Sequence, residues 1–186
     1  MDGGVRRGRG LALIGYRGTG KSTVGRILAE RLGRPFFDAD RELEKRLGLT
    51  VSAVFRTVGE QAFRDWEERI LEELLVEPDA IVATGGGVVL REANRLRLRA
   101  FGTVVWLMAD APILARRLLV DEGSGAVRPA LTPMGTLDEI VAVLFERTPL
   151  YRATSDLEVA TDGKTPEEVA DEVSKIVRDR STFWTG

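Results

Sequence analysis

The 186-residue sequence contains no cysteine and no histidine. Without cysteine the chain cannot form a disulfide, a thiolate zinc site, an iron–sulfur cluster or a cysteine nucleophile. Without histidine it has no Ser-His-Asp triad, no imidazole base and no histidine metal ligand. Acid–base chemistry is therefore left to Asp, Glu, Lys or Tyr. Any metal must be a hard cation on oxygen ligands, with Mg²⁺ the leading candidate.

Long apolar runs and an excess of one charge are also absent. The longest apolar runs, 104–109 and 140–145, are six residues each, whereas a membrane span needs about 20. The opening segment, MDGGVRRGRG, is basic and glycine-rich but leads into only four apolar residues, so it lacks a secretory signal. We therefore expect a cytoplasmic protein with no membrane partner. The net charge of −2 argues against a nucleic-acid partner.

Short apolar runs alternate with longer amphipathic segments, which is typical of an α/β protein. The apolar runs predict five strands, at 11–14, 36–37, 80–83, 103–108 and 157–160. The amphipathic segments predict short helices across 43–58, a helix beginning at Ala111, and helices at 21–32, 60–76, 91–100, 136–147 and 166–178. We expect a parallel sheet flanked by helices in three layers, with ligands at the carboxyl ends of the strands.

The segment Gly15-Tyr-Arg-Gly-Thr-Gly-Lys-Ser22 fits the pattern G-x-x-x-x-G-K-[ST] between a predicted strand and a predicted helix. The pattern predicts a P-loop: backbone N–H groups wrap a phosphate, Lys21 reaches the β and γ phosphates, and Ser22 can ligate Mg²⁺. An ordinary glycine-rich turn would not require Lys and Ser at those two places. A dinucleotide site is disfavoured, because its last glycine would fall on Thr23.

The chain is predicted to form a single P-loop domain over 11–178. A flexible tail would precede it at 1–10, and another tail would follow at 179–186. The thirteen residues 121–133 hold two glycines, two prolines and a lone Arg128 without periodicity, so we expect a mobile lid loop there. Closure of this lid would exclude water and bring Arg128 onto the phosphates.

Two carboxylates follow the second predicted strand, at Asp38 and Asp40. The third strand ends in Thr84 and glycines, so the carboxylate for magnesium must come from elsewhere, and Asp38 is the best candidate. Asp40 would point the same way if the chain stays extended. The alternative is that both residues begin the next helix, with one acting as its N-cap.

Three glycines, 85–87, follow the third strand, and their bare backbone can approach a small polar ligand closely. A flexible turn is the commoner explanation of such a triplet. Arg64 lies in the 60–76 helix and could form a surface ion pair with Glu67 or Glu68. Alternatively, Arg64 and Arg152 beside the glycine loop could clamp a substrate carboxylate between two guanidiniums.

The chain resembles the shikimate kinase family, a branch of the nucleoside-monophosphate-kinase-like P-loop proteins. The resemblance covers roughly residues 11–177 and rests on GYRGTGKST, FFDAD, GEQAFRDWE, TGGGVV, VRPAL and RTPLYR in the family's order. It implies transfer of the ATP γ-phosphoryl group to the 3-hydroxyl of shikimate, on the route to chorismate. The family's usual VRPLL is replaced here by VRPAL, and the match over 161–166 is loose.

The resemblance also implies roles for individual residues. Catalysis would rest on Lys21, Asp40 and Arg128, and Mg²⁺ on Ser22 and Asp38. ATP would contact Gly18, Thr19, Gly20, Lys21, Ser22, Thr23, Arg117 and Arg128. Shikimate would contact Asp40, Arg64, Gly86, Gly87 and Arg152. Glu67 would support the site, and Phe55 and Phe63 would form its apolar wall.

Several questions stay open at this level. The length of the segment between Arg117 and Arg128 leaves open whether Arg116 or Arg117 lies against adenine. Asp40 is placed to accept the proton of the attacking hydroxyl. Other readings are a gluconate or nucleoside monophosphate kinase, or a module that binds ATP without turnover. The expected partners are shikimate and ATP, and the expected state is a monomer.

Overall fold

The computed structural model describes residues 8–123 and 136–182. Five parallel strands form one sheet in the order β2-β3-β1-β4-β5. The strands are β1 (Gly10–Ile14), β2 (Phe36–Asp38), β3 (Ile81–Ala83), β4 (Gly102–Met108) and β5 (Leu157–Ala160). The predicted five-stranded parallel sheet is therefore confirmed. Since all strands run the same way, the loops after them meet at one edge of the sheet.

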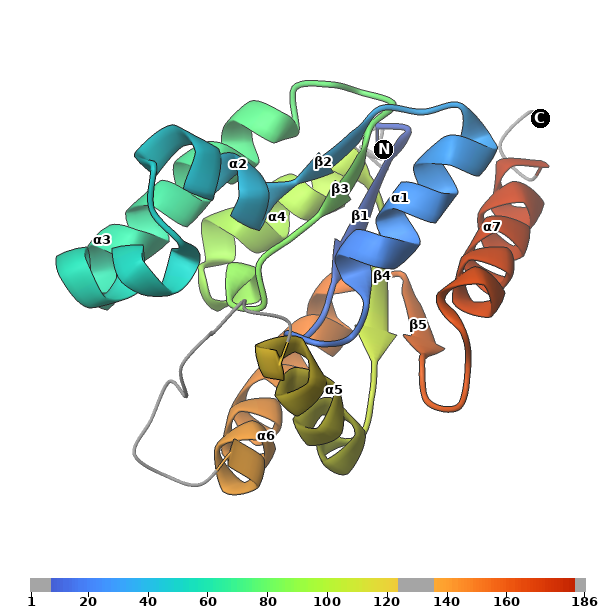
Figure 1. The fold of residues 1–186 in the computed structure, drawn as a ribbon. Helices are drawn as coiled ribbons and strands as arrows, with labels where there is room; N and C mark the ends of the chain where they lie inside the picture. Colours follow the sequence, from blue (N-terminus) through green and yellow to red (C-terminus); the bar gives the residue numbers. More distant parts are fainter. Residues whose placement is uncertain (1–7, 124–135, 183–186) are drawn as a thin grey trace.

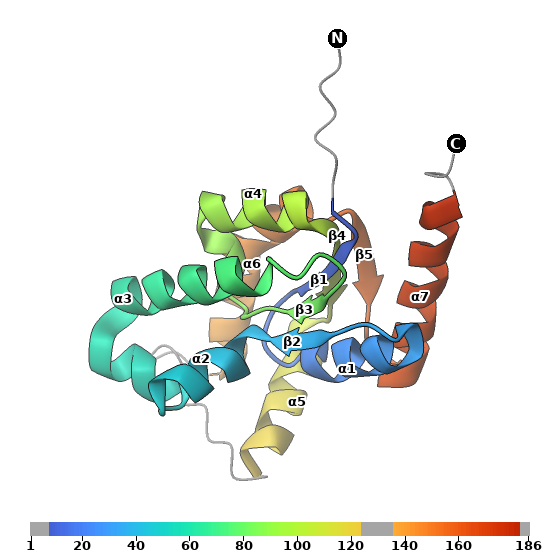
Figure 2. The ribbon, with the colours of Figure 1, turned by 90° about the horizontal axis from the view of Figure 1, so that it is seen from above.

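Helices cover both faces of the sheet, as Figures 1 and 2 show. They are α1 (Lys21–Leu32), α2 (Ala39–Leu47), α3 (Val51–Leu74), α4 (Glu92–Phe101), α5 (Ala111–Gly123), α6 (Thr136–Thr154) and α7 (Pro166–Thr182), and a short 3₁₀ turn spans Val88–Leu90. Helices α1 and α7 pack on one face, and α3, α4 and α6 pack on the other. The predicted three-layer arrangement is confirmed.

Strand β1 shows how the sequence produces these layers. Successive side chains of a strand point to opposite faces. Leu11 and Leu13 pack with α1 and α7, whereas Ala12 and Ile14 pack with α3, α4 and α6. All four side chains are buried, because both faces of the sheet are covered.

Two helices differ from the sequence-based expectation. The short helices predicted across 43–58 are α2 and the first part of α3, which continues into the predicted 60–76 helix across a kink. At this kink Gly59 has φ 80° and ψ 171°, which are not helical. Helix α6 runs through Pro149 to Thr154 instead of stopping near 147. Proline removes one N–H from a helix, and packing of Tyr151 against Trp106, with ring centroids 5.5 Å apart, holds the last turns in place.

The expected tails and lid are shorter than predicted where the structure describes them. The amide of Gly8 donates to the carbonyl of Ala100 at 2.9 Å and Gly10 begins β1, so residues 8–10 belong to the fold. Helix α5 extends to Gly123, which makes the first three residues of the predicted lid helical. Helix α7 likewise includes 179–182. The rest of the lid, with Arg128, and residues 1–7 and 183–186 lie outside the described residues.

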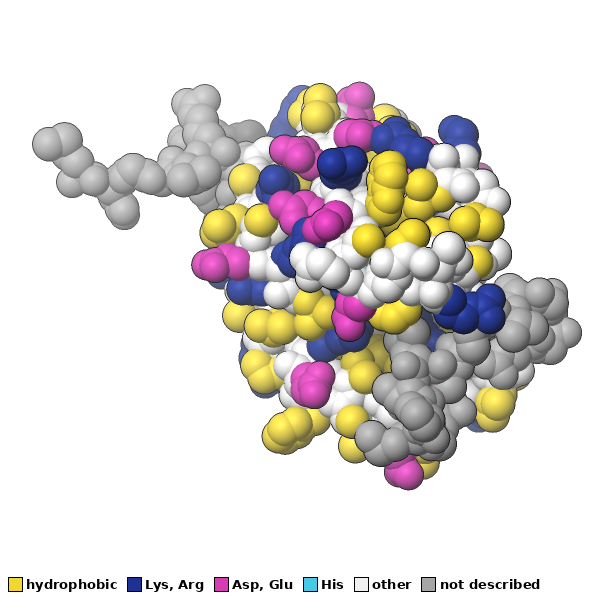
Figure 3. Space-filling model, turned by 90° about the vertical axis from the view of Figure 1, so that its left-hand side faces the viewer, with side chains coloured by type: hydrophobic (Ala, Val, Ile, Leu, Met, Phe, Trp, Pro, Cys, Tyr) yellow, Lys and Arg dark blue, Asp and Glu magenta, His cyan; other side chains and the backbone are white. Residues whose placement is uncertain are grey.

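The described helices include none that is both long and apolar enough to cross a membrane. On the face carrying α2 and α3, basic and acidic side chains are interspersed with apolar ones (Figure 3). One charge cluster joins α3 to α4 and its N-cap: Arg91 pairs with Glu68 at 2.7 Å, and Arg97 pairs with the same carboxylate at 2.9 Å. Surface pairs of this kind each contribute little to stability, and a network contributes more.

Candidate active site

The loop between β1 and α1 has the shape expected for a phosphate cradle. Gly18 and Gly20 adopt φ of 80° and 89°, in the left-handed region that favours glycine. Lys21 is buried, and its Nζ donates to the carbonyls of Gly15 and Tyr16, at 2.8 Å each. This ammonium is therefore held over the loop at the N-terminal end of α1, where backbone N–H groups and the helix dipole favour an anion.

The remaining predicted nucleotide contacts lie around this loop. Thr19 is buried and donates its hydroxyl to the carbonyl of Tyr16 at 2.8 Å, which closes the turn. Ser22 is half-buried and Thr23 is exposed in the first turn of α1. The loop thus presents a hydroxyl, an ammonium and backbone amides together.

Arg117 connects the phosphate loop to the loop after β5. Its guanidinium donates to the carbonyl of Gly18 at 3.3 Å, and to the hydroxyl and carbonyl of Thr161 at 2.9 Å each. Arg116, by contrast, is exposed. Of the two candidates for the adenine contact, the structure therefore places Arg117 beside the phosphate loop.

Asp38 and Asp40 end up in different surroundings. Asp38 closes β2 and caps α2, since its Oδ1 accepts the amide of Arg41 at 3.2 Å. It is both a strand-end residue and an N-cap, so the N-cap reading is confirmed for Asp38 and its role as a metal ligand stays a prediction. The chain becomes helical at Ala39, so the expectation that Asp40 follows an extended chain is wrong. Asp40 instead lies in the first turn of α2 and lines the pocket described next.

A pocket opens between the phosphate loop, α2, α3, the glycine loop and α6. Its lining residues are Tyr16, Arg17, Asp40, Val51, Ser52, Phe55, Phe63, Arg64, Glu67, Gly85, Gly86, Gly87 and Arg147. The rings of Phe55 and Phe63 form an apolar wall, with centroids 5.4 Å apart. Charged side chains and glycine backbone make up the rest, so the pocket suits a small ligand with an apolar face and several polar groups.

Arg64 and Glu67 form an ion pair inside this pocket. Arg64 Nη1 lies 2.8 Å from Glu67 Oε2, and the two residues are 9% and 5% exposed. The predicted alternative of a surface pair is therefore wrong. Burial raises the pKa of Glu67, and the charge and hydrogen bond of Arg64 oppose this rise. The neighbouring carboxylate of Asp40 raises the pKa of Glu67 further.

Charged side chains crowd the backbone at positions 85 and 87, so these positions require glycine. A Cβ atom at residue 85 would lie 2.8 Å from both Asp40 Oδ1 and Glu67 Oε1, and a Cβ at residue 87 would overlap the guanidinium of Arg64. The flexible turn considered from sequence is therefore a close approach of backbone to charged groups.

Gly87→Ala should displace Arg64 while leaving the backbone unstrained, because Gly87 has φ −100°. If Arg64 binds the acceptor, which is the molecule that receives the phosphoryl group, KM for the acceptor should rise roughly 10-fold or more. Steady-state kinetics with both substrates varied would measure this effect, and KM for ATP serves as the internal control. An unchanged acceptor KM, or an equal rise for ATP, would count against the placement of Arg64 in the acceptor site.

The structure places Arg147, and not Arg152, beside the glycine loop. Arg147 lines the pocket and donates from Nη1 to the carbonyl of Gly86 at 3.1 Å. Arg152 points elsewhere: its side chain is 63% exposed and pairs with Glu158 at 3.0 Å. The expectation that Arg152 lies with Arg64 at the glycine loop is therefore wrong. Arg147 was missed because helix α6 was expected to stop there.

Tyr151, one helical turn after Arg147, was missed as well. Residues four apart share a helix face, and the hydroxyl of Tyr151 also donates to the carbonyl of Gly86. Burial raises the pKa of Tyr151 to about 12, so the phenol stays protonated at neutral pH and remains a donor. The i, i+4 spacing of Arg147 and Tyr151 puts the two side chains on one face of a helix, but it does not say what that face contacts.

Comparison with known proteins agrees with this geometry. The family model for shikimate kinase matches residues 17–178. The shikimate kinases of Rhodopirellula baltica and Chromohalobacter salexigens are 41% and 44% identical, and each alignment covers 88% or more of both chains. The structure of the Acinetobacter baumannii shikimate kinase in complex with shikimate superposes with a TM-score of 0.86 at 32% identity, and covers 92% of this chain and 94% of that one.

A gluconokinase from Sinorhizobium meliloti also superposes, with a TM-score of 0.59 at 19% identity, and it shows the fold alone. By its sequence and its architecture, the chain belongs to the shikimate kinase family.

Proposed function

We propose that this protein transfers the γ-phosphoryl group of ATP to the 3-hydroxyl of shikimate, giving shikimate 3-phosphate and ADP. The observation that carries the proposal is the pocket in which Arg64 and Arg147 flank a glycine loop next to a phosphate loop. Guanidiniums bind carboxylates in a bidentate manner. Shikimate is a carboxylated ring with hydroxyls, so its carboxylate suits the arginines and its ring suits the wall of Phe55 and Phe63.

The proposed chemistry is mainly positioning and charge stabilisation, as phosphoryl transfer requires. Lys21 would stabilise charge on the transferred group, and Arg117 would hold the nucleotide beside Gly18. Asp40 would accept the proton of the attacking hydroxyl. Gly86 and Gly87 would contact the acceptor through their backbone. Arg128 stays a prediction from the sequence, as do a monomeric state and a cytoplasmic location.

Magnesium fits the oxygen donors at this edge of the sheet. Ser22 offers a hydroxyl at the start of α1, and Asp38 offers a carboxylate at the end of β2. The described residues contain no cluster of three acidic side chains that could hold a metal. Mg²⁺ in kinases is commonly held by one or two protein oxygens together with substrate phosphates, so Ser22 and Asp38 suffice. The ion would neutralise charge on the phosphates.

A panel of acceptors tests the proposal directly. Purified protein with Mg·ATP should release ADP, measured by a coupled assay, when shikimate is added. Gluconate and nucleoside monophosphates should give at most background release. Turnover with one of these instead would show another small-molecule kinase on the same fold. No turnover with any of them, together with measurable ATP binding, would indicate a binding module.

Arg147→Ala and Arg152→Ala form a matched pair, because both residues lie on α6 and only Arg147 lines the pocket. Loss of one charge-assisted hydrogen bond should raise KM for shikimate roughly 10- to 100-fold in Arg147→Ala. Arg152→Ala removes an exposed pair with Glu158 and should change this KM by less than about twofold. Steady-state kinetics measure both values of KM. A larger rise in Arg152→Ala than in Arg147→Ala would assign the carboxylate contact to Arg152.

A further inference from the structure

Arg17 lies in the phosphate loop and also lines the acceptor pocket. It is the third residue of the segment that begins at Gly15, and lies three residues after the end of β1. Its guanidinium carbon lies 5.7 Å from the ring centroid of Tyr16. Three guanidiniums therefore line this pocket, from Arg17, Arg64 and Arg147. Only Arg17 comes from the loop that cradles the phosphates.

All three guanidiniums carry a donor that the protein itself does not use. The Nε atoms of Arg17, Arg64 and Arg147 are buried and have no hydrogen-bond partner in the part of the chain that the structure describes. Buried donors without a partner are costly, and native proteins contain few of them. The three arginines that carry these atoms line one pocket, and three guanidiniums together suit a ligand rich in acceptor oxygens.

The backbone of Arg17 packs against the glycine loop. A Cβ atom at residue 86 would lie 3.3 Å from the amide nitrogen of Arg17. The carbonyl of the same glycine accepts from Arg147. Arg17 and Arg147 therefore approach Gly86 from the phosphate loop and from α6, so an anion bound beside Gly86 lies within the reach of both side chains.

The protein's own carboxylates leave Arg17 with donors to spare. Arg64 is held tightly by Glu67, at 2.8 Å. Arg17 contacts Glu139, the buried residue in the first turn of α6, through Nη2 alone and at the longer distance of 3.3 Å. A guanidinium has five N–H donors in a planar fork. Because this one contact is long, the remaining N–H groups can donate to a second carboxylate.

We propose that Arg17 is a third guanidinium for the carboxylate of the acceptor, so that the phosphate loop itself recognises the negative charge of the molecule it phosphorylates. The inference rests on the proposed function. Lys21 and Arg117 donate to carbonyls of the phosphate loop, whereas Arg17 lines the pocket with Arg64 and Arg147. Arg17 is in this account a specificity-determining residue that contacts the substrate.

The test compares shikimate with its methyl ester, which keeps the ring and hydroxyls and removes the charge. Dissociation constants of both ligands are measured by titration for the wild type and for Arg17→Met. The dissociation constant of shikimate should rise roughly 10-fold, and that of the ester should change by less than about twofold. The preference for the acid over the ester should therefore shrink roughly 10-fold.

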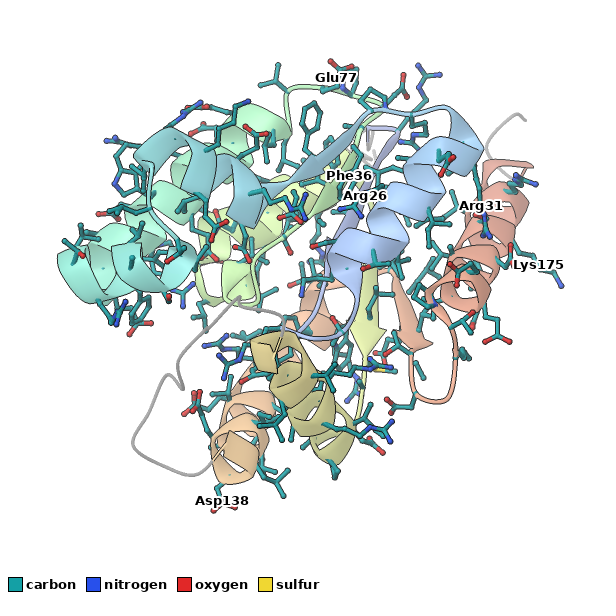
Figure 4. The ribbon with its side chains drawn as sticks, in the orientation of Figure 1. Arg26, Arg31, Phe36, Glu77, Asp138 and Lys175 are labelled. Atoms are coloured by element: carbon teal, nitrogen blue, oxygen red, sulfur yellow. The ribbon has the colours of Figure 1, made fainter. Side chains whose placement is uncertain are left out.

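Two further variants make the result specific. Arg26→Met removes an exposed arginine on α1 (Figure 4) and should leave the acid-to-ester preference unchanged. Arg17→Lys keeps the charge without the fork and should retain most of the preference. Arg17→Gln, which also removes the charge, replaces Arg17→Met if that variant does not fold.

Three outcomes would overturn the proposal. Equal losses for acid, ester and ATP would mean that Arg17 only ties the loop to Glu139. An unchanged preference with a lower kcat would mean that Arg17 acts on the transferred phosphoryl group. An unchanged preference and an unchanged kcat would remove Arg17 from the site. Each of these presupposes wild-type turnover with shikimate, so a wild type without turnover would instead refute the proposed function.

Discussion

Replacing Lys21 with methionine should lower kcat for shikimate phosphorylation roughly 10²- to 10³-fold. The ammonium of Lys21 is buried and fixed over the phosphate loop by the carbonyls of Gly15 and Tyr16. A fixed cation in a site with little water stabilises the charge of the transferred phosphoryl group without reorganisation. Methionine has a similar length and no charge. Single-turnover measurements with saturating ATP would isolate the effect on the phosphoryl-transfer step.

The fold should survive this change. The methionine leaves two loop carbonyls without the ammonium, so the melting temperature should fall by roughly 5 °C. Lys175→Met is the matched control: Lys175 is exposed on α7 (Figure 4), and its loss should alter neither kcat nor melting temperature. Near-normal kcat in Lys21→Met would contradict the role of Lys21. If Lys21→Met does not fold, kcat would be measured instead for Lys21→Arg, which keeps the positive charge on a group of different shape.

Asp40→Asn should lower kcat roughly 10²- to 10⁴-fold, the usual contribution of a general base. Among the described residues, the carboxylates that line the pocket are those of Asp40 and Glu67. Glu67 already donates its charge to a buried ion pair and hydrogen bond with Arg64, so it is less available to take the proton of an incoming hydroxyl. Asparagine keeps the shape of Asp40 and removes its charge and basicity. Measuring kcat and the shikimate KM separately distinguishes loss of the base from loss of binding.

Asp38→Asn provides the comparison for Asp40→Asn. Asp38 caps α2 and is the proposed magnesium ligand, so its variant should require more Mg²⁺ for half-maximal rate and should retain a higher kcat than Asp40→Asn at saturating Mg²⁺. Asp38→Ser or Asp38→Thr would separate the capping role from the metal role, because serine and threonine can cap the helix without a carboxylate. If both asparagine variants change only the Mg²⁺ requirement, the assignment of Asp40 as base is wrong.

The local patterns in the sequence determined the sheet and the phosphate loop. The alternation of Leu11 and Leu13 with Ala12 and Ile14 predicts a strand buried on both faces, because neighbouring side chains of a strand point to opposite faces. Gly18, Gly20 and Lys21 are close in sequence, so spacing alone predicts the cradle that they form. Asp40 and the glycine loop were expected near one another, because each follows a strand and parallel strands end at a common edge.

Only the tertiary structure decided which arginine of α6 reaches the pocket. Arg147 and Arg152 are five residues apart, and each residue of an α-helix turns about 100° from the one before, so the phase and length of α6 decide which side chain faces Gly86. The helix was expected to end at 147, and packing of Tyr151 on Trp106 carries it further, through Pro149. The burial of Glu67 and the place of Arg17 beside Gly86 likewise depend on contacts between segments far apart in the chain. Such contacts carry no local signal, because they arise only when the sheet brings its loops together.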